Sequence, residues 1–585
     1  MINFDSLSLK ALTEELSPIL ASGRIHKVQQ PSKRELLLTI RAFGKNHKLY
    51  ICVDPKYPHV ALLSKDGEEF RRMEKPQFPP MFCMLLRKHM EGCKINAMRQ
   101  PEFERIFEIC FDSCSELGTK VPMVLSCEFM GKYSNIILYN YETNMILGCA
   151  HTVSSEKSRE REVAGGLPFV YPPKQEKLDI NKISEEEFFD LLKVIPTPVN
   201  VWLNEKFGYM SRAVATEICH VCKIKTEKDT VTAVSPEKAE YLYRLTKETV
   251  NLENKNPCLS EDMKFYSPIG LDKSVKWRSA NTTNSMIDEY FGRQVFEDKF
   301  SRQKNSLFDA VKKEFKKKKK LFAKHEKTFQ SENKQDKYRQ FGDLIMTNLY
   351  RIKLGMSCVE LENIYEDNKP VEIELDAMKF PSDNAQRYYK LYNKAKTASQ
   401  YSEKLMNGIQ GELDYLESIK ESVNIAETID DLTQIRQELI EQDIIKRKEA
   451  KQSKKEQIIP AVFTSSDGFT ILAGKNNRQN EYILKTSSPE DIWLHVQDIP
   501  GSHVVIKRVE NEEIPKTTLH EAVYIAAWYS SGRESSNIPV IYTRRKFVKK
   551  PSGSKPGYVI FTREKTLWVN PEKEKVMALR KQGGF

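Results

Sequence analysis

The chain has 585 residues, of which 40% are hydrophobic and 30% charged, and its formal net charge is +11. No stretch approaches the roughly 18 consecutive apolar residues of a membrane-spanning helix, so the composition excludes a helical membrane protein and predicts no membrane partner. Because a single hydrophobic core stops growing at about 250–300 residues, this length predicts about three to five domains.

The start of the chain and its cysteines indicate a cytoplasmic protein. The N-terminal sequence MINFDSLSLKALTEELSPIL contains Asp5, Glu14 and Glu15 and lacks the basic region of a signal peptide. The eleven cysteines follow no regular spacing, unlike the disulfide framework of a secreted protein. Two of them, Cys219 and Cys222 in CHVC, have too few further ligands nearby for a closed zinc site, so we expect buried thiols and no metal.

Residues 1–176 are predicted to form a mixed α/β domain. The segment LTEELSPILASGRI is typical of a short helix that ends at Gly23, and PPMFCMLLRKHMEG of one that ends at Gly92. Compact apolar runs such as ELLLTIRA, KLYICV and MVLSCEFM predict strands. Two consecutive prolines in LPFVYPPKQEK mark the end of this domain.

Residues 177–270 are predicted to be helical. Ser184 is the expected N-cap of the helix ISEEEFFDLLKVI. The segment VNVWLNEKFGYMSRAVATEICHV indicates two short helices around Gly208, a helix-hairpin-helix pattern. Such hairpins can bind a nucleic-acid backbone through main-chain amides. A plain helical connector fits the sequence equally well.

Residues 271–455 are predicted to form a long antiparallel coiled-coil arm. Eleven positions between 388 and 423 step by four and three, and eight of them are apolar, as in a coiled-coil seam. The segment from Met286 to about Gln335 is the expected partner helix, and turn and strand signals predict a small tip at about 338–386. The seam positions are 388, 392, 395, 399, 402, 406, 409, 413, 416, 420 and 423.

Residues 456–585 are predicted to form a β-rich α+β domain, so the fold class is multidomain α+β. The runs FTILAG, EYILK, IWLHV and HVVIK have strand length, and TLHEAVYIAAWYSSG is typical of a helix closed by Gly532. The segment VIYTRRKFVKKPSGSKPGYVIFT predicts two strands around a basic turn.

Two segments carry a surplus of positive charge. Residues 541–585 contain twelve Lys or Arg and three Glu, which favours a polyanion such as nucleic acid. VKKEFKKKKKLF contains seven lysines, which suit either a polyanion or a solvated helix face. Aromatic residues among the C-terminal basic residues could stack on unpaired bases. These aromatic residues are Tyr542, Phe547, Tyr558 and Phe561.

His495 and His503, in DIWLHVQDIPGSHVVIK, are the two histidines in a suggestive setting. They flank a predicted turn with no cysteine or third histidine beside them, so a metal site is disfavoured. We expect polar contacts to a bound backbone, or hydrogen bonds that fix the turn. The chain also lacks the Walker A, GxGxxG, HExxH and GxSxG motifs.

Eight motifs resemble the NFACT family in their order along the chain. GKNNRQNEYIL, DIWLHVQDIPGSHVVI, TLHEAVYIAAWYSS and KKPSGSKPGYVIF resemble the family's C-terminal RNA-binding domain. SGRIHKVQQPSKRELLLTIRA, PPMFCMLLRKHMEG and FMGKYSNIIL resemble its first domain, and FPSDNAQRYYKLYNKAK its second coiled-coil entry.

The resemblance implies a ribosome quality control factor without cofactor or enzymatic activity. Such a factor binds the large ribosomal subunit, through 23S rRNA and ribosomal proteins, when peptidyl-tRNA is stranded on it. It recruits alanyl-tRNA and directs template-free C-terminal alanine tailing of the stalled chain for degradation, while the ribosome forms the bonds. A small S4-like RNA-binding protein is an implied further partner.

The resemblance also implies site residues. Asp5 matches an early family Asp, and Glu104–Arg105 stands where the family has an Asp-Arg pair needed for tRNA recruitment and tailing. Lys132, in MGKYSN, is the basic residue retained from the family's Met-Gly-Arg-His-Ser-Asn. The expected RNA-binding residues are Lys475, Asn476, Asn477, Arg478, His495, His503, Arg544, Arg545, Lys549, Lys550 and Lys555.

Three alternatives follow from the same sequence. The extra methylene of Glu104 could leave a ribosome- and tRNA-binding homologue without tailing activity. The family's older label suggests a fibronectin-binding surface adhesin, which exposure on intact cells would support. The first two domains also resemble formamidopyrimidine-DNA glycosylases, but those enzymes use an N-terminal proline nucleophile and this chain has Ile2.

Overall fold

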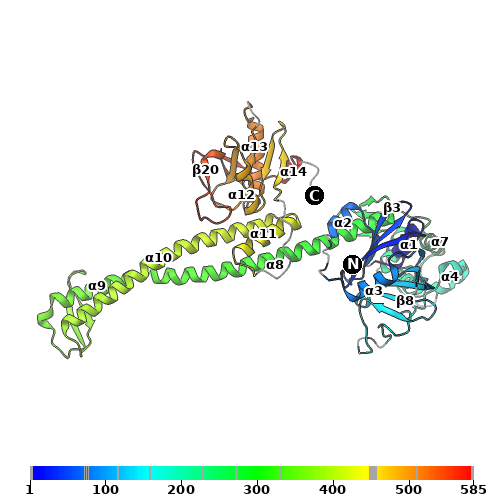
Figure 1. Ribbon diagram of the computed structural model, residues 1–585, viewed down its shortest axis with the longest axis horizontal. Coiled ribbons are helices and arrows are strands. Elements are labelled where there is room, and N and C mark those ends of the chain that lie inside the picture. The colour runs from blue at the N-terminus through cyan, green and yellow to red at the C-terminus, as the bar shows by residue number, and fades with distance from the viewer. Residues whose placement is uncertain are drawn as a thin grey trace. The chain divides into compact units, whose positions relative to one another are not determined.

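The computed structural model describes residues 4–580 except 72, 74, 75, 77, 115–117, 157, 159, 194, 195, 226–228, 271–274, 330, 331, 447–457 and 509–511. The chain divides into two compact units, residues 1–299 and 300–585 (Figure 1). Helices and strands occur in both, as the predicted α+β fold class requires.

Two antiparallel sheets form the core of the first unit. Both follow chain order, because short turns connect neighbouring strands. Helix α1 (Ser6–Leu20) buries Leu9, Leu12 and Leu16 in the core that both sheets share. The predicted strands and the two predicted helices of residues 1–176 are confirmed. The elements are β1 (Arg24–Ser32), β2 (Glu35–Ala42), β3 (Lys45–Cys52), β4 (His59–Leu62), α2 (Lys65–Arg71), α3 (Met81–Met90), β5 (Ile95–Arg99), β6 (Ile106–Cys114), β7 (Lys120–Glu128), β8 (Asn135–Asn140) and β9 (Ile146–Cys149).

Short helices follow and pack on the other side of α1. Ser184 forms a capping box with Glu187 at the start of α4, as predicted. Helices α5 and α6 form the predicted hairpin around Gly208, and Cys219 and Cys222 are buried in its core. These elements are α4 (Glu185–Leu192), α5 (Val199–Lys206), α6 (Arg212–Val221), α7 (Pro236–Val250) and the small sheet of β10 (Cys258–Ser260), β11 (Tyr266–Ser267) and β12 (Trp277–Ser279).

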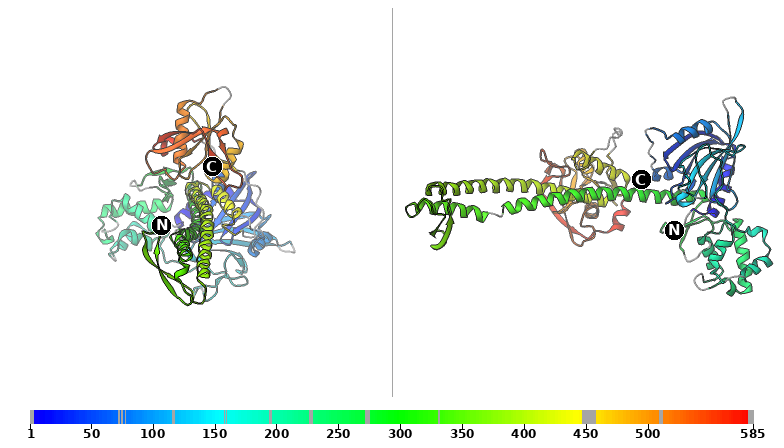
Figure 2. Two further views of the ribbon diagram at one scale, coloured as in Figure 1. Left: turned by 90° about the vertical axis from the view of Figure 1, so that its left-hand side faces the viewer. Right: turned by 90° about the horizontal axis from the view of Figure 1, so that it is seen from below.

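Two long helices form the predicted arm. Helix α8 (Thr283–Phe329) and helix α10 (Pro381–Ile425) lie side by side, with Leu307 and Val311 packed against Leu416 and Ile419 (Figures 1 and 2). Helix α9 (Glu332–Thr347) and the hairpin of β13 (Cys358–Asn363) and β14 (Lys369–Glu374) form the predicted tip. Most of the lysines in the lysine-rich segment of α8 are exposed.

The seam of α10 departs from the predicted register near its C-terminal end. Ile419 is fully buried between α8 and α10, whereas the predicted seam residue Lys420 is exposed. An α-helix has 3.6 residues per turn, so a strict 3.5-residue spacing drifts off the buried face over several turns. The prediction of Lys420 in the seam is therefore wrong by one residue.

The C-terminal domain is built on a six-stranded antiparallel sheet with the order β15-β16-β18-β17-β19-β22. Helix α13 covers one face, and α12 with the β20–β21 ribbon covers the other. Helix α11 joins the end of α10 to this domain. The elements are α11 (Ile429–Glu441), β15 (Ala461–Thr464), β16 (Thr470–Ala473), α12 (Asn477–Thr486), β17 (Ile492–Val496), β18 (Val504–Ile506), α13 (Lys516–Trp528), β19 (Ile538–Arg544), β20 (Val548–Lys549), β21 (Ile560–Phe561), β22 (Lys565–Val569) and α14 (Lys573–Ala578).

The segment EYILK is helical and not a strand, which corrects the prediction. Asn476 caps the helix by accepting a hydrogen bond from the N–H of Gln479. Ile483 and Leu484 then lie on one face of α12 and pack against the sheet. A short apolar run fits strand and helix periods equally, and here the cap decides.

Candidate nucleic-acid interface

The two histidines lie in the hairpin that the sequence predicts. β17 and β18 pair antiparallel, with Trp493 opposite Val505. Trp493 is fully buried, and His503 is 2% exposed. The rings of Trp493 and His495 stack at 5.8 Å, and the ring of His503 meets that of Trp493 edge-on at 5.4 Å. The prediction that these side chains contact RNA is not supported by this inward placement.

Burial lowers the pKa of both His495 and His503, so both imidazoles are neutral near pH 7. His495 Nε2 lies 3.3 Å from the carbonyl oxygen of Gly501, within the turn itself. His495 therefore bonds within the turn, which is the second of the two roles expected from the sequence, whereas His503 packs against Trp493. Within the described part of the chain, no group of three or more His, Cys, Asp or Glu is arranged to hold a metal ion.

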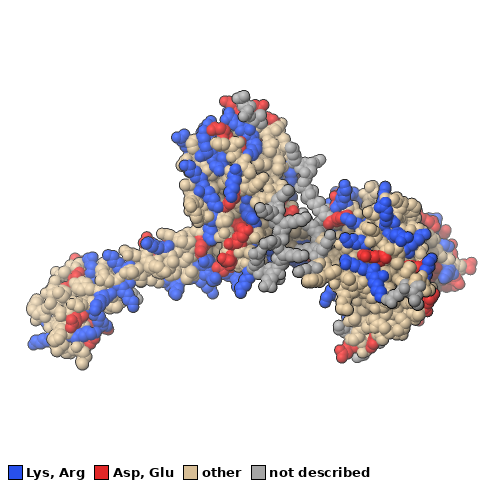
Figure 3. Space-filling model, in the orientation of Figure 1, with Lys and Arg blue, Asp and Glu red and all other residues tan. Residues whose placement is uncertain are grey.

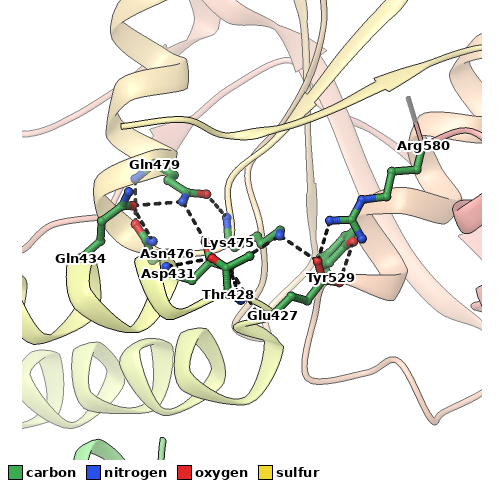
Figure 4. Close-up of polar contacts among 9 residues, drawn as sticks. All are labelled: Glu427, Thr428, Asp431, Gln434, Lys475, Asn476, Gln479, Tyr529 and Arg580. Carbon is green, nitrogen blue, oxygen red and sulfur yellow. Dashed lines mark hydrogen bonds and ion pairs between the residues drawn. The ribbon is translucent and has the colours of Figure 1, made fainter. Parts of the chain in front are cut away.

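Lys475 points into the protein rather than to solvent. Its Nζ donates to Glu427 at 2.7 Å and lies 3.6 Å from the carboxylate of Asp431, at the start of α11 (Figure 4). Glu427 also accepts hydrogen bonds from the Tyr529 hydroxyl at 3.1 Å and from Arg580 at 2.9 Å. Burial alone would raise the pKa of Glu427, but these donors hold it below its ordinary value. The charge of Lys475 is thus balanced inside the protein.

The neighbouring amides of this motif also face α11. Nδ2 of Asn476 and Nε2 of Gln479 both donate to the side-chain oxygen of Gln434 at 3.0 Å (Figure 4). Nδ2 of Asn477 donates to Glu438 at 2.9 Å. These side chains are buried, so each needs the partner that α11 supplies.

Arg478 and Lys555 complete this contact at its exposed edge. The guanidinium of Arg478 lies 3.7 Å from Glu441, and Nζ of Lys555 donates to Gln442 at 2.8 Å. Six of the predicted RNA-binding residues, including both histidines, are thus buried or bonded within the protein, and Lys555 is bonded likewise. Direct RNA contact would require these bonds to break.

The exposed basic residues gather where β18 and β19 end. Arg508, Arg544 and Lys546 lie around a single carboxylate, Glu490, and Figure 3 shows basic side chains spread over one face of the domain. Arg545, by contrast, donates to the carbonyl oxygens of Leu484 and Val548 and is structural. Lys549 is exposed, and Lys550 forms an ion pair with Glu481.

The predicted aromatic residues divide between core and surface. Phe561 packs against Trp493, whereas Tyr558 is exposed. The ring of Phe547 has two cations against it, Lys546 at 5.5 Å and Arg563 at 4.8 Å. Trp568 was not among the predicted aromatic residues, although it is 61% exposed on the outermost strand β22. The only feature of the sequence that could have indicated an exposed aromatic residue here is its position after the basic turn.

Asp5 is a structural residue of the first unit. Its Oδ1 accepts a hydrogen bond from the N–H of Ser8 at 2.8 Å and caps α1. Its Oδ2 accepts a hydrogen bond from the hydroxyl of Ser211 at 2.6 Å, and Ser211 in turn caps α6. Asp5 therefore joins the first helix to the helix hairpin, with little surface left for a ligand.

Hydrogen bonds fix the backbone at Glu104 and Arg105. The side chain of Gln100 donates to the backbone carbonyls of Glu104 and of the first residue of α1, at 2.7 and 3.0 Å. The carbonyl oxygen of Arg105 accepts a hydrogen bond from the N–H of Phe129 at 2.9 Å, three residues before Lys132. Of the four residues predicted for this site, the structure therefore places Glu104 close to the start of α1, which Asp5 caps, and Arg105 beside Phe129.

Positive charge predominates around Glu104. Burial raises the pKa of Glu104, and the charges of Arg105, Lys177 and Lys174 partly oppose this effect. Among the described residues, the guanidinium of Arg105 has no hydrogen-bond or ion-pair partner. Lys132 is exposed and lies 4.8 Å from the ring of Tyr133. Lys174 and Lys177 were not among the predicted site residues. The only feature of the sequence that could have indicated them is their place beside the predicted domain boundary.

Both units match models of one protein family. The model for the NFACT N-terminal and middle domains matches residues 5–457, and the model for the NFACT protein RNA binding domain matches residues 460–563. None of the described helices is both long and apolar enough to cross a membrane.

Relatives are similar to this chain over nearly its whole length. The Rqc2 homolog RqcH of Bacillus subtilis is 32% identical over 99% of this chain and 100% of that protein. That of Streptococcus pneumoniae serotype 2 is 31% identical over the same shares. A structure of the C-terminal part of the fibronectin/fibrinogen-binding protein from Streptococcus suis covers 48% of this chain and 99% of that one, with 30% identity and a TM-score of 0.39. Because one family model matches most of the chain and the RqcH relatives match nearly all of it, the chain belongs to the NFACT family, among the bacterial RqcH proteins.

Proposed function

We propose that the chain is a positioning factor, not an enzyme, that directs alanine tailing on obstructed large ribosomal subunits. Its family and its RNA-binding domain assign it to ribosome quality control, with ribosomes and RNA as partners. In the proposed reaction it binds a large subunit that retains peptidyl-tRNA, recruits alanyl-tRNA and leaves bond formation to the ribosome. It acts in the cytoplasm, with a small S4-like RNA-binding protein as a further partner.

The observation that carries this proposal is the guanidinium of Arg105, which has no hydrogen-bond or ion-pair partner in the part of the chain that the structure describes. It lies beside Glu104 and two lysines, in a turn whose position is fixed by Gln100 and by the backbone bond to Phe129. A guanidinium on a fixed backbone can present two parallel donors to a phosphate or a base edge. This is the chemistry that a tRNA contact requires.

Glu104 distinguishes the two versions of the proposed function. Its carboxylate is partly buried, and its pKa is raised because burial disfavours the charge. If the longer side chain still reaches the tRNA contact, tailing proceeds. If it does not, the chain binds ribosomes and tRNA without extending the stalled chain, and Glu104→Asp would then restore tailing.

The test is RNA sequencing after purification of the tagged full chain from growing cells. We expect 23S rRNA and alanine tRNA to be enriched with the unchanged chain. Arg105→Ala should lose the tRNA and retain the rRNA. Arg41→Ala, which removes an exposed arginine from β2, is the matched control and should retain both. Equal recovery of tRNA with Arg105→Ala would contradict the assigned role of Arg105.

A further inference from the structure

Glu490 lies at the centre of three cations in the C-terminal domain. Its carboxylate is 2.7 Å from Nζ of Lys546, 3.2 Å from a guanidinium nitrogen of Arg544 and 3.8 Å from one of Arg508. The four side chains come from the α12–β17 loop, the end of β18, the end of β19 and the turn after it. Elements distant in the sequence thus converge on one carboxylate.

The backbone fixes this arrangement. The N–H of Lys546 donates to the carbonyl of Pro489 at 3.0 Å, and that of Arg545 donates to the carbonyl of Asp491 at 2.8 Å. The buried carboxylate of Asp491 accepts from the N–H of Arg508 at 3.0 Å. The loop that carries Glu490 is therefore held against the ends of both basic strands.

The charges of this cluster are not balanced. Three cations face one carboxylate, which leaves a surplus of two positive charges. The ion pairs are open to solvent, with Arg544 52% and Glu490 40% exposed. The hydrogen bond from Lys546, with the charges of Arg544 and Arg508, lowers the pKa of Glu490, so it is ionised near pH 7. Arg563, which like Lys546 lies against the ring of Phe547, adds a further cation nearby.

A phosphate group binds the same donors as a carboxylate. Arginine and lysine pair with either group through charge-assisted hydrogen bonds, and arginine does so with two parallel donors. A phosphate of RNA that approaches Arg544 and Lys546 therefore meets Glu490 already bound to them. The two anions repel each other and cannot share the same donors.

We infer that Arg508, Arg544 and Lys546 form a phosphate-binding site for RNA and that Glu490 occupies the position of the phosphate until RNA displaces it. This inference rests on the proposed function, because it presumes that the domain binds RNA. Glu490 weakens binding at this site and thereby disfavours RNA that cannot displace it. Contacts elsewhere on the same RNA would supply the free energy for the displacement.

The test compares RNA affinities of the full chain by fluorescence anisotropy, with a labelled single-stranded RNA of about 20 nucleotides as the probe. Glu490→Gln keeps the shape of the side chain and removes its charge. We expect Kd to fall by about two- to fivefold at low salt, the range set by an exposed ion pair, with a smaller gain at high salt. Lys546→Ala should raise Kd, because it removes one of the phosphate donors.

Glu574→Gln is the matched control, since it removes one negative charge from an exposed position on α14 of the same domain. Equal affinities of Glu490→Gln and Glu574→Gln would overturn the inference, because net charge alone would then explain any gain. RNA binding by the unchanged chain with no gain in Glu490→Gln would overturn it as well. No binding by any variant would contradict the proposed RNA contact itself. Binding by Glu490→Gln alone would support the inference most strongly.

Discussion

Glu427 accepts hydrogen bonds from Lys475, Tyr529 and Arg580, three residues from separate parts of the C-terminal domain. Lys475 is 48 residues away along the chain, and no local pattern links the two. For this reason the sequence could suggest Lys475 as a functional residue but could not show that it pairs with Glu427, just before α11. The predictions for Arg105 and Lys132 come from the resemblance alone, and the structure places the charge of Arg105 near Glu104.

Glu427→Gln should destabilise the C-terminal domain. The substitution leaves the buried ammonium of Lys475 with only the more distant carboxylate of Asp431, and removing a charged hydrogen bond costs about 1.5–3 kcal/mol. The measurement is the thermal transition of this domain by calorimetry, supported by hydrogen exchange of α12. Glu417→Gln, at an exposed position of α10, should leave both unchanged. A normal transition in Glu427→Gln would show that the contact adds nothing to stability.

Stability should also fall as the pH decreases below about 6.5, the ordinary pKa of histidine. The pKa of His495 and of His503 is lowered in the folded state by burial, so the unfolded chain binds protons that the folded chain does not. Their contribution is present above the unfolded pKa and is lost as the pH falls toward the folded pKa. Calorimetry between pH 7.5 and 5.5 measures this loss. Replacing both with Gln should flatten the pH dependence, whereas His520→Gln on the exposed face of α13 should preserve it.

At the scale of elements, periodicity predicted the helices that have long apolar faces. Helix α10 has 45 residues and, at 1.5 Å per residue, is about 68 Å long. Its ends and tip were predictable because proline, turn and strand signals are local. Its seam was predicted correctly except at Lys420, because the other ten predicted positions are buried or half-buried and a strict heptad spacing drifts slightly off a helix of 3.6 residues per turn. The helix α12 was missed for a related reason: a five-residue apolar run has no period of its own.

The corrected seam predicts different effects for two adjacent substitutions. Ile419→Ala creates a cavity between α8 and α10 and should destabilise the arm by about 2–5 kcal/mol. Lys420→Ala changes an exposed residue and should alter stability by less than about 0.5 kcal/mol. Thermal unfolding followed by circular dichroism measures both. A larger loss of stability in Lys420→Ala than in Ile419→Ala would instead support the predicted seam position at 420.

At the scale of the whole molecule, each unit carries its own basic surface. The first unit presents Arg105 with Lys174 and Lys177, and the second presents the cluster around Glu490. The order of domains could be predicted, because composition changes along the chain. Within the C-terminal sheet, the pairing of β17 with β18 could be predicted from the turn that joins them. The pairing of β17 with β19 could not, because no local signal in the sequence specifies it.

Because the surfaces around Arg105 and Glu490 are separate, we expect that substitutions can abolish the binding of tRNA and of 23S rRNA independently. The double variant Arg544→Ala and Lys546→Ala should reduce the recovery of 23S rRNA from cells. It should also weaken the salt dependence of RNA binding, by about 0.7 in slope for each phosphate that is no longer neutralised. Arg105→Ala should reduce tRNA alone. Sequencing of co-purified RNA measures both recoveries, and a decrease of both RNAs in every variant would indicate one shared surface.

The central claim is that the chain directs alanine tailing through the site around Arg105. The most direct measurement is mass analysis of nascent chains on the large subunits that purify with the tagged protein. The account predicts C-terminal alanine extensions with the unchanged chain and with Arg41→Ala, and none with Arg105→Ala. Nascent chains without extensions in any variant, or equal extensions in Arg105→Ala, would contradict it.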